Sequence, residues 1–153
     1  MPYTQAVFVN EHFYHIYNRG VAKQPIFRDT RDFRQAVLGL NYYRARRPPL
    51  KLSRFKQLSV NDRETYLNTK ISRDQLLVEV IGYVLMPNHF HLLLRQIADN
   101  GISVYVSRFT NSFTRFFNTR HDRVGPLLQG TFKAIRVEND ERLLHLSRYI
   151  LIL

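Results

Sequence analysis

The stretch "YVLMPNHFHLLL", residues 83–94, predicts the centre of the fold. It lies within two apolar runs, 76–86 and 89–95, which are separated by a Pro-Asn pair that suits a tight connection. Because side chains alternate along a strand, His89 and His91 project from one face, and the phenylalanine between them points into the core. The stretch therefore predicts a β-hairpin that carries two imidazoles on one side.

Strand and helix patterns continue on both sides of this hairpin. Alternating side chains predict strands, and apolar residues at three- and four-residue spacing predict helices. Strands are expected at 13–20 and 130–138, and helices at 29–47 (ended by Pro48), at 100–121, from Asn139 or Asp140 onward, and as a short piece in "VNDRETYLN", 60–68. The order β-α-β-β-α-β-α indicates an α+β fold of the ferredoxin-like (RRM-like) class, with a four-stranded antiparallel sheet and helices, as one domain over residues 1–153.

Composition restricts the class of protein. A chain of 153 residues, 44% of them hydrophobic, is long enough for one domain with a core and short for two. The absence of cysteine excludes disulfides and thiolate metal sites. The sequence has no signal-peptide pattern at its beginning and no window near the roughly 20 apolar residues that cross a bilayer. We therefore expect a cytoplasmic protein that does not contact membranes.

Positive charge is the strongest property of the composition. The 23 Lys and Arg residues exceed the 12 Asp and Glu residues, for a net charge of +11, and the cations concentrate in 28–63 and 101–136. Most are arginines, whose planar guanidinium suits phosphate oxygens. Nucleic acid is a better match than membrane, because no long helix has one apolar and one lysine-rich face. The plainer alternative is a basic surface that contacts only solvent.

The histidine pair has two interpretations. Neutral imidazoles two residues apart on a strand, about 7 Å along it, can converge on one cation, although they supply half or less of a coordination shell. Most His-x-His pairs are surface or hydrogen-bonded core histidines. The position of this pair, directly after a turn in a basic protein, favours the metal site.

Several motifs together resemble one family. "MPNHFHLLL" resembles the histidine-hydrophobe-histidine (HUH) motif of single-tyrosine transposases, the small insertion-sequence transposases of bacteria and their REP-associated tyrosine transposase relatives. "YHIYNRG" resembles their first strand, "FTRFFNTRHDRVGPLLQGTFKA" their segment of helix, loop and fourth strand, and "LLHLSRYI" their tyrosine helix. The resemblance covers essentially the whole chain and is weakest over 48–76.

The resemblance implies an activity. Such enzymes cut and rejoin single-stranded DNA, often at hairpin ends, through a 5′-phosphotyrosine, with Mg²⁺ or Mn²⁺ held by the two histidines. It implies metal ligands at His89 and His91, the nucleophile at Tyr149, and a bacterial, nucleoid-associated protein, and it allows a homodimer as well as a monomer. We expect DNA contacts from the arginines and lysine that the basic segments supply: Arg19, Arg44, Arg46, Arg47, Arg108, Arg115, Arg120, Arg123, Lys133 and Arg148.

The sequence departs from the family pattern at its end. The family places a third metal ligand, Asn or Gln, four residues after the tyrosine, where this chain has Leu153. We therefore expect a domain that is incomplete at its C-terminus. A catalytically weakened, transposase-derived module that binds single-stranded or hairpin DNA is the second hypothesis. An RNA-binding domain of the same topology, with the aromatics of "FYHIYNRG" stacking bases, is the third.

Overall fold

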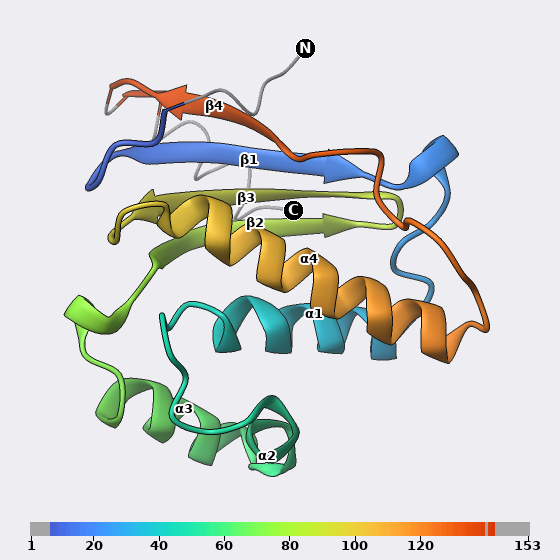
Figure 1. Ribbon diagram of the computed structural model, residues 1–153, viewed down its shortest axis with the longest axis horizontal. Coiled ribbons are helices and arrows are strands. Elements are labelled where there is room, and N and C mark those ends of the chain that lie inside the picture. The colour runs from blue at the N-terminus through green and yellow to red at the C-terminus, as the bar shows by residue number, and fades with distance from the viewer. Residues whose placement is uncertain (1–6, 140, 143–153) are drawn as a thin grey trace.

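The protein is a four-stranded antiparallel sheet with helices on one face (Figure 1). The computed structural model describes residues 7–139, 141 and 142. The sheet order is β2-β3-β1-β4, and each neighbouring pair is antiparallel. The strands are β1 (Phe13–Arg19), β2 (Val78–Met86), β3 (His89–Gln96) and β4 (Lys133–Val137). This arrangement confirms the ferredoxin-like class and the central hairpin.

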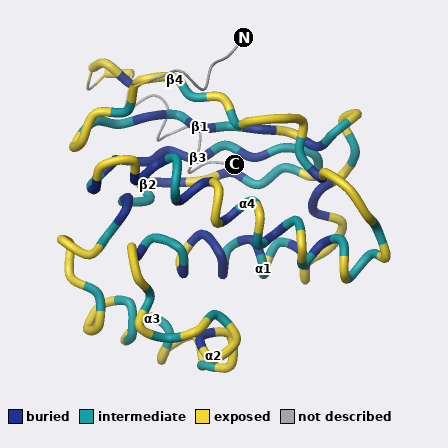
Figure 2. Tube along the Cα trace, in the orientation of Figure 1, coloured by how far each residue is buried: buried dark blue, intermediate teal, exposed yellow. Residues whose placement is uncertain are grey.

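Two long helices cover one face of the sheet. They are α1 (Thr30–Tyr42) and α4 (Gly101–Arg120), and they bury the apolar side of β1 and β3 (Figure 2). Leu92 and Leu94 of β3 are fully buried there, together with Ile16 of β1. Within the described part of the chain, no helix combines the length and the apolar character that crossing a membrane demands.

Helix α4 begins where glycine alone fits. Asn100 precedes it with φ 58°, and a Cβ atom added at Gly101 would lie 2.1 Å from the carbonyl oxygen of Leu77. The first turn of α4 can therefore pass directly over the backbone that leads into β2. This contact fixes the end of α4 against the sheet.

Helix α1 ends earlier than its sequence predicts. The pattern predicted a helix over 29–47, but the helix stops at Tyr42. The carbonyl of Arg44 accepts a hydrogen bond from the Leu77 amide at 2.6 Å, and the Arg46 amide donates to Gln75 at 2.8 Å. Because these backbone groups pair with the segment before β2, they are not available to extend the helix.

A two-helix insert follows α1. It consists of α2 (Leu52–Gln57), which the sequence did not predict, and α3 (Val60–Thr69), which confirms the short helix expected there. The insert lies on the far side of α1 from the sheet (Figure 1). Phe55 packs with Leu38 and Tyr42 in a small core of its own. Short 3-10 turns lie at Val21–Lys23 and Arg73–Gln75.

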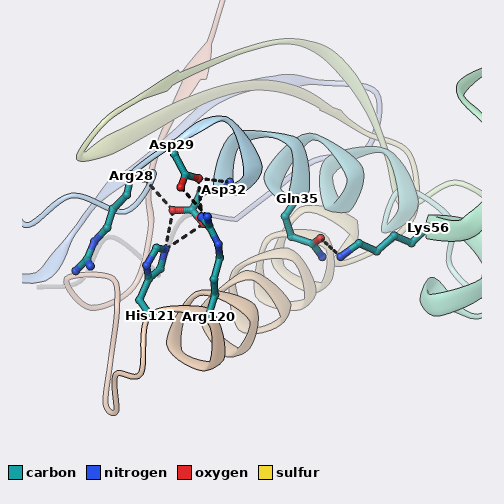
Figure 3. A network of polar contacts seen from close by, with 7 residues as sticks. All are labelled: Arg28, Asp29, Asp32, Gln35, Lys56, Arg120 and His121. Carbon is teal, nitrogen blue, oxygen red and sulfur yellow. Dashed lines mark hydrogen bonds and ion pairs between the residues drawn. The ribbon is translucent and has the colours of Figure 1, made fainter.

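A polar network joins the start of α1 to the end of α4 (Figure 3). Asp32 is completely buried and accepts hydrogen bonds from Arg120 at 2.8 Å and from the Arg28 amide at 2.9 Å. His121 lies 2.9 Å from the same carboxylate, and Asp29 pairs with the other guanidinium nitrogen of Arg120 at 2.6 Å. When the two helices pack, these polar side chains lose hydrogen bonds to water, and the network supplies protein partners in their place.

Stability in acid is expected to depend on Asp29. Its hydrogen bond from Arg120 lowers the pKa of Asp29 from 3.8 to about 2. The folded protein then binds this proton more weakly than the unfolded chain, so the contribution is complete above 3.8 and is lost as the pH falls through about 2. Asp29→Asn, which can still cap α1, should lower the unfolding midpoint at neutral pH. The midpoint of this variant should then fall less steeply than that of the native protein between pH 3.8 and about 2. In an Arg120→Gln background, Asp29→Asn should cause no further loss of stability. If Asp29→Asn lowered the midpoint equally at every pH, the pairing with Arg120 would not explain the lowered pKa of Asp29.

Candidate metal and nucleic-acid site

The two predicted metal ligands lie on the same face of the sheet. β3 is an inner strand between β2 and β1, and His89 and His91 are partly exposed on the face opposite α1 and α4. Phe90 is 1% exposed and belongs to the core, as the alternation predicted. The rings of His89 and His91 lie 5.1 Å apart, at an interplanar angle of 89°.

Strand β1 brings two further rings to the pair. The register places Tyr17 opposite His91 and His15 opposite Leu93, two positions farther along the strand. The ring of His15 lies 5.0 Å from that of His91, and the ring of Tyr17 lies 5.9 Å from it. His15 and Tyr17 were not predicted as site residues. Alternation in "FYHIYNRG" places both on one face, but only the strand register shows that this face carries the histidine pair.

Hydrogen bonds fix the orientation of both imidazoles. Nδ1 of His89 donates to the side-chain oxygen of Asn88 at 2.8 Å, since a carbonyl oxygen only accepts. Nδ1 of His91 lies 2.8 Å from Nε2 of His15. Neighbouring side chains thus engage Nδ1 of both rings. Partners of this kind typically orient histidine ligands in metal sites.

The environment keeps His91 neutral. Burial lowers the pKa of His91 to about 4, and repulsion from His15 and His89 acts in the same direction. Burial also lowers the pKa of His15, with a further contribution from the charge of Arg142. Leu93, two positions along β3 from His91, is fully buried beside Val84. A neutral imidazole is the form that coordinates a metal ion, so His91 is in that form at physiological pH.

His89 and His91 are the candidate metal donors, and His15 contacts His91. The described residues contain no group of three or more His, Cys, Asp and Glu side chains placed to hold one metal ion. The donor set fits an ion that takes its other ligands from water, from substrate oxygens or from residues outside the described part.

The predicted DNA-binding cations lie in three places. Arg19 and Lys133 flank the histidine face, because the register sets them opposite His89 and Tyr17. A second group lies after α1 and on the nearby surface of α4, where Arg108 donates to the carbonyl of Arg46 at 2.9 Å. The second group consists of Arg44, Arg46, Arg47 and Arg108. The third group lies in the second half of α4 and just after it, and consists of Arg115, Arg120 and Arg123.

Two of these cations bind other groups of the protein itself. Arg120 was expected to contact DNA, but it binds Asp29 and Asp32, so its charge is already balanced. Arg123 donates to the carbonyl oxygens of Gly125 and Pro126 and holds the loop after α4. Arg115 is exposed. The predicted residues Arg148, Tyr149 and Leu153, and the body of the last expected helix, lie outside the described residues.

Comparisons with known proteins identify the fold. The chain resembles a REP-associated tyrosine transposase solved bound to a REP hairpin, with a TM-score of 0.55 and 13% identity over 99% of this chain and 72% of the other. It also resembles a Deinococcus radiodurans R1 protein named as a candidate transposase, with a TM-score of 0.51 and 12% identity over 95% and 92% of the two chains. No family model and no curated protein matches the sequence. The chain therefore has the fold of tyrosine transposases, as its motifs predicted.

Proposed function

We propose that the protein is a metal-dependent tyrosine transposase of the HUH type, which cuts and rejoins single-stranded DNA. The observation that carries this proposal is the histidine pair on an inner strand, in which a neighbouring side chain contacts Nδ1 of each ring. The transposase fold, the net charge of +11 and the hairpin-bound state of one solved relative support DNA as the substrate.

His89 and His91 would hold a divalent ion, Mg²⁺ or Mn²⁺. When bound, such an ion polarises a scissile phosphate and stabilises the charge that develops on it. Imidazole nitrogens favour Mn²⁺ over Mg²⁺, so Mn²⁺ is the better ion for experiments. His15 and Asn88 hold the two rings in place, and Arg19 and Lys133 are positioned to bind the flanking phosphates.

Tyr149 is the proposed nucleophile. Its phenolic oxygen attacks the phosphorus and gives up its proton, and the bond from phosphorus to the 3′ oxygen breaks. The products are a 5′-phosphotyrosine and a free 3′ hydroxyl. Rejoining reverses these bond changes with a new 3′ hydroxyl, so no separate energy source is needed.

A DNA-binding module with weakened catalysis is the second candidate. Two observations favour it: the described residues supply two metal donors, and the family's position for a third ligand is Leu153. Such a protein would bind DNA through the same cations without forming a covalent bond.

A covalent-adduct assay distinguishes the two. The protein is incubated with Mn²⁺ and a labelled DNA hairpin that has single-stranded flanks, and then denatured. The transposase should carry the label through denaturation, and EDTA should prevent this. Mass spectrometry of the labelled peptide should identify Tyr149; a label on Tyr17, the tyrosine beside the histidines, would overturn that assignment. DNA binding without an adduct would reject the enzyme in favour of the binding module.

Removal of His15 is expected to weaken metal binding. His15→Ala removes the partner of His91 Nδ1, so the ring loses its fixed orientation. Loss of such a partner typically reduces metal affinity 10- to 100-fold, and we expect a Mn²⁺ dissociation constant about tenfold higher or more, measured by titration calorimetry. His12→Ala is the matched control, because His12 precedes β1 and lies outside the ring cluster. Equal affinities of the His15 and His12 variants would contradict the positioning role.

A further inference from the structure

Helix α1 lies between two hollows on the side of the molecule away from the histidines. One, of about 560 Å³, opens between α1 and β2, and the other, of about 860 Å³, opens between α1 and the insert α2–α3. The same four residues line both: Phe33, Val37 and Asn41 of α1, and Arg44 just beyond its end. The three helical residues are spaced by four positions and lie on one face of α1, and because all four residues line both hollows, the hollows form one continuous surface. We call it the α1 groove.

Among the described residues, Arg44 at the end of this groove has no acidic partner. Its Nε donates to the carbonyl of Asn41 at 3.2 Å, and the ion pairs of the described residues do not include it. Burial lowers the pKa of Arg44, which shows that its charge is partly removed from water. A partly buried cation without a counter-charge is costly and favours the binding of an anion.

Other cations rim the groove. Arg31 and Arg34 are exposed on α1, and the described residues place neither in an ion pair. Lys56 joins the insert to α1 by donating to the side-chain oxygen of Gln35 at 2.8 Å (Figure 3). Arg63 joins α3 to α2 by donating to the carbonyl oxygen of Lys56 at 2.7 Å. Glu64 is the one carboxylate among the lining residues of the larger hollow. The rim is therefore strongly positive.

The floor of the groove is apolar. Tyr83 and Ile81 of β2 line the smaller hollow and are 40% and 39% exposed, which is unusual for residues of this size. Phe33 and Val37 continue the floor across α1, and Leu67 extends it into the insert. A tyrosine ring with an open face is a stacking surface for a base.

We propose that the α1 groove binds an unpaired segment of DNA, with phosphates on Arg34 and Arg44 and bases against the apolar floor. The choice of DNA rests on the proposed function. A duplex presents phosphates and hides its base faces, so it would leave the floor unused. An unpaired strand offers phosphates and bases together and matches both properties of the groove. An acidic peptide is the competing ligand, and the experiment includes it.

The test measures binding of a fluorescent 12-nucleotide oligo(dT) by anisotropy over a range of salt concentrations. The groove variant is Arg34→Gln/Arg44→Gln. The control, Arg73→Gln/Arg136→Gln, removes the same charge from exposed positions that do not line the groove. We expect at least about tenfold weaker binding by the groove variant and a salt slope smaller by about 1.4, at about 0.7 per lost phosphate contact. The control should bind within about twofold of the native protein.

Two additions make the result decisive. Because Arg44 is partly buried, Arg31→Gln/Arg34→Gln serves as a second variant at two exposed positions, which guards against a folding defect. A Tyr83→Ala variant tests stacking: weaker binding with an unchanged salt slope supports bases on the floor. Native-like binding by both arginine variants would overturn the proposal, and so would displacement of the oligonucleotide by polyglutamate but not by unlabelled oligo(dT).

The binding test of the groove and the adduct assay of the proposed function can fail independently. Native-like binding by the groove variants, together with adduct formation by the native protein, rejects the groove and leaves the transposase intact. Weakened binding by the groove variants, with no adduct from any form, supports the groove and rejects the enzyme. The comparison is repeated in protein that carries His89→Ala/His91→Ala. There the groove substitutions should weaken oligo(dT) binding by the same factor.

Discussion

Replacing His89 and His91 by alanine is expected to abolish the covalent DNA adduct. The two imidazoles are the proposed metal ligands, so their loss should remove the charge that stabilises the reacting phosphate. Removal of a single charge-stabilising group typically slows a reaction 10²- to 10³-fold. We therefore expect adduct formation to fall by at least about a thousandfold, measured by gel shift after denaturation in Mn²⁺.

DNA binding should survive the same exchange. His91 is neutral at physiological pH, and the flanking cations Arg19 and Lys133 remain. The affinity for single-stranded DNA and its salt dependence should therefore stay within about twofold of the native values. His12→Ala controls for the loss of a histidine as such. A double alanine variant that still forms the adduct with Mn²⁺ would show that the pair does not hold the catalytic ion.

Asp32→Ala is expected to cause the largest loss of stability. Its carboxylate is completely buried and accepts from Arg120 and from the Arg28 amide, and it lies beside His121. Removing one partner of a buried pair leaves the other charge uncompensated and typically costs 3–5 kcal/mol. Because Asp29 still pairs with Arg120, we expect a value near the low end, about 3 kcal/mol, in the free energy of unfolding measured with urea.

Asp62→Ala is the matched control for this stability measurement. Asp62 also lies in the first turn of a helix, α3, but it is exposed. Its loss should cost well under 1 kcal/mol, which is typical of exposed charges. A similar effect of the two exchanges would mean that the network in Figure 3 contributes no more than a surface charge.

Local pattern predicted the sheet and its two covering helices. Strand alternation and helical spacing lie within the sequence, so β1, the central hairpin and α4 were correctly predicted. The end of α1 was wrong because hydrogen bonds to Gln75 and Leu77, distant in sequence, stop the helix before Pro48. Helix α2 was missed because its six residues, around Phe55, are too few for a period to appear.

The placement of the histidine pair on one face of a strand was predicted, and its neighbours on β1 were not. His89 and His91 share a strand, so alternation alone sets them on one face. His15 lies 76 positions from His91, and its hydrogen bond to that ring depends on the register between β1 and β3. The role of Arg120 was likewise hidden, since Asp29 is 91 positions away. Contacts of this range depend on tertiary packing, which periodicity does not encode.

The insert that forms one wall of the α1 groove has a consequence for dynamics. Helix α3 buries none of its residues, and the small core around Phe55 is separate from the core beneath the sheet. Such a unit can unfold locally while the rest of the domain stays native. Amide hydrogens of α3 should then exchange with deuterium far faster than those of β3, and a ligand seated in the groove should slow the exchange of α3 alone.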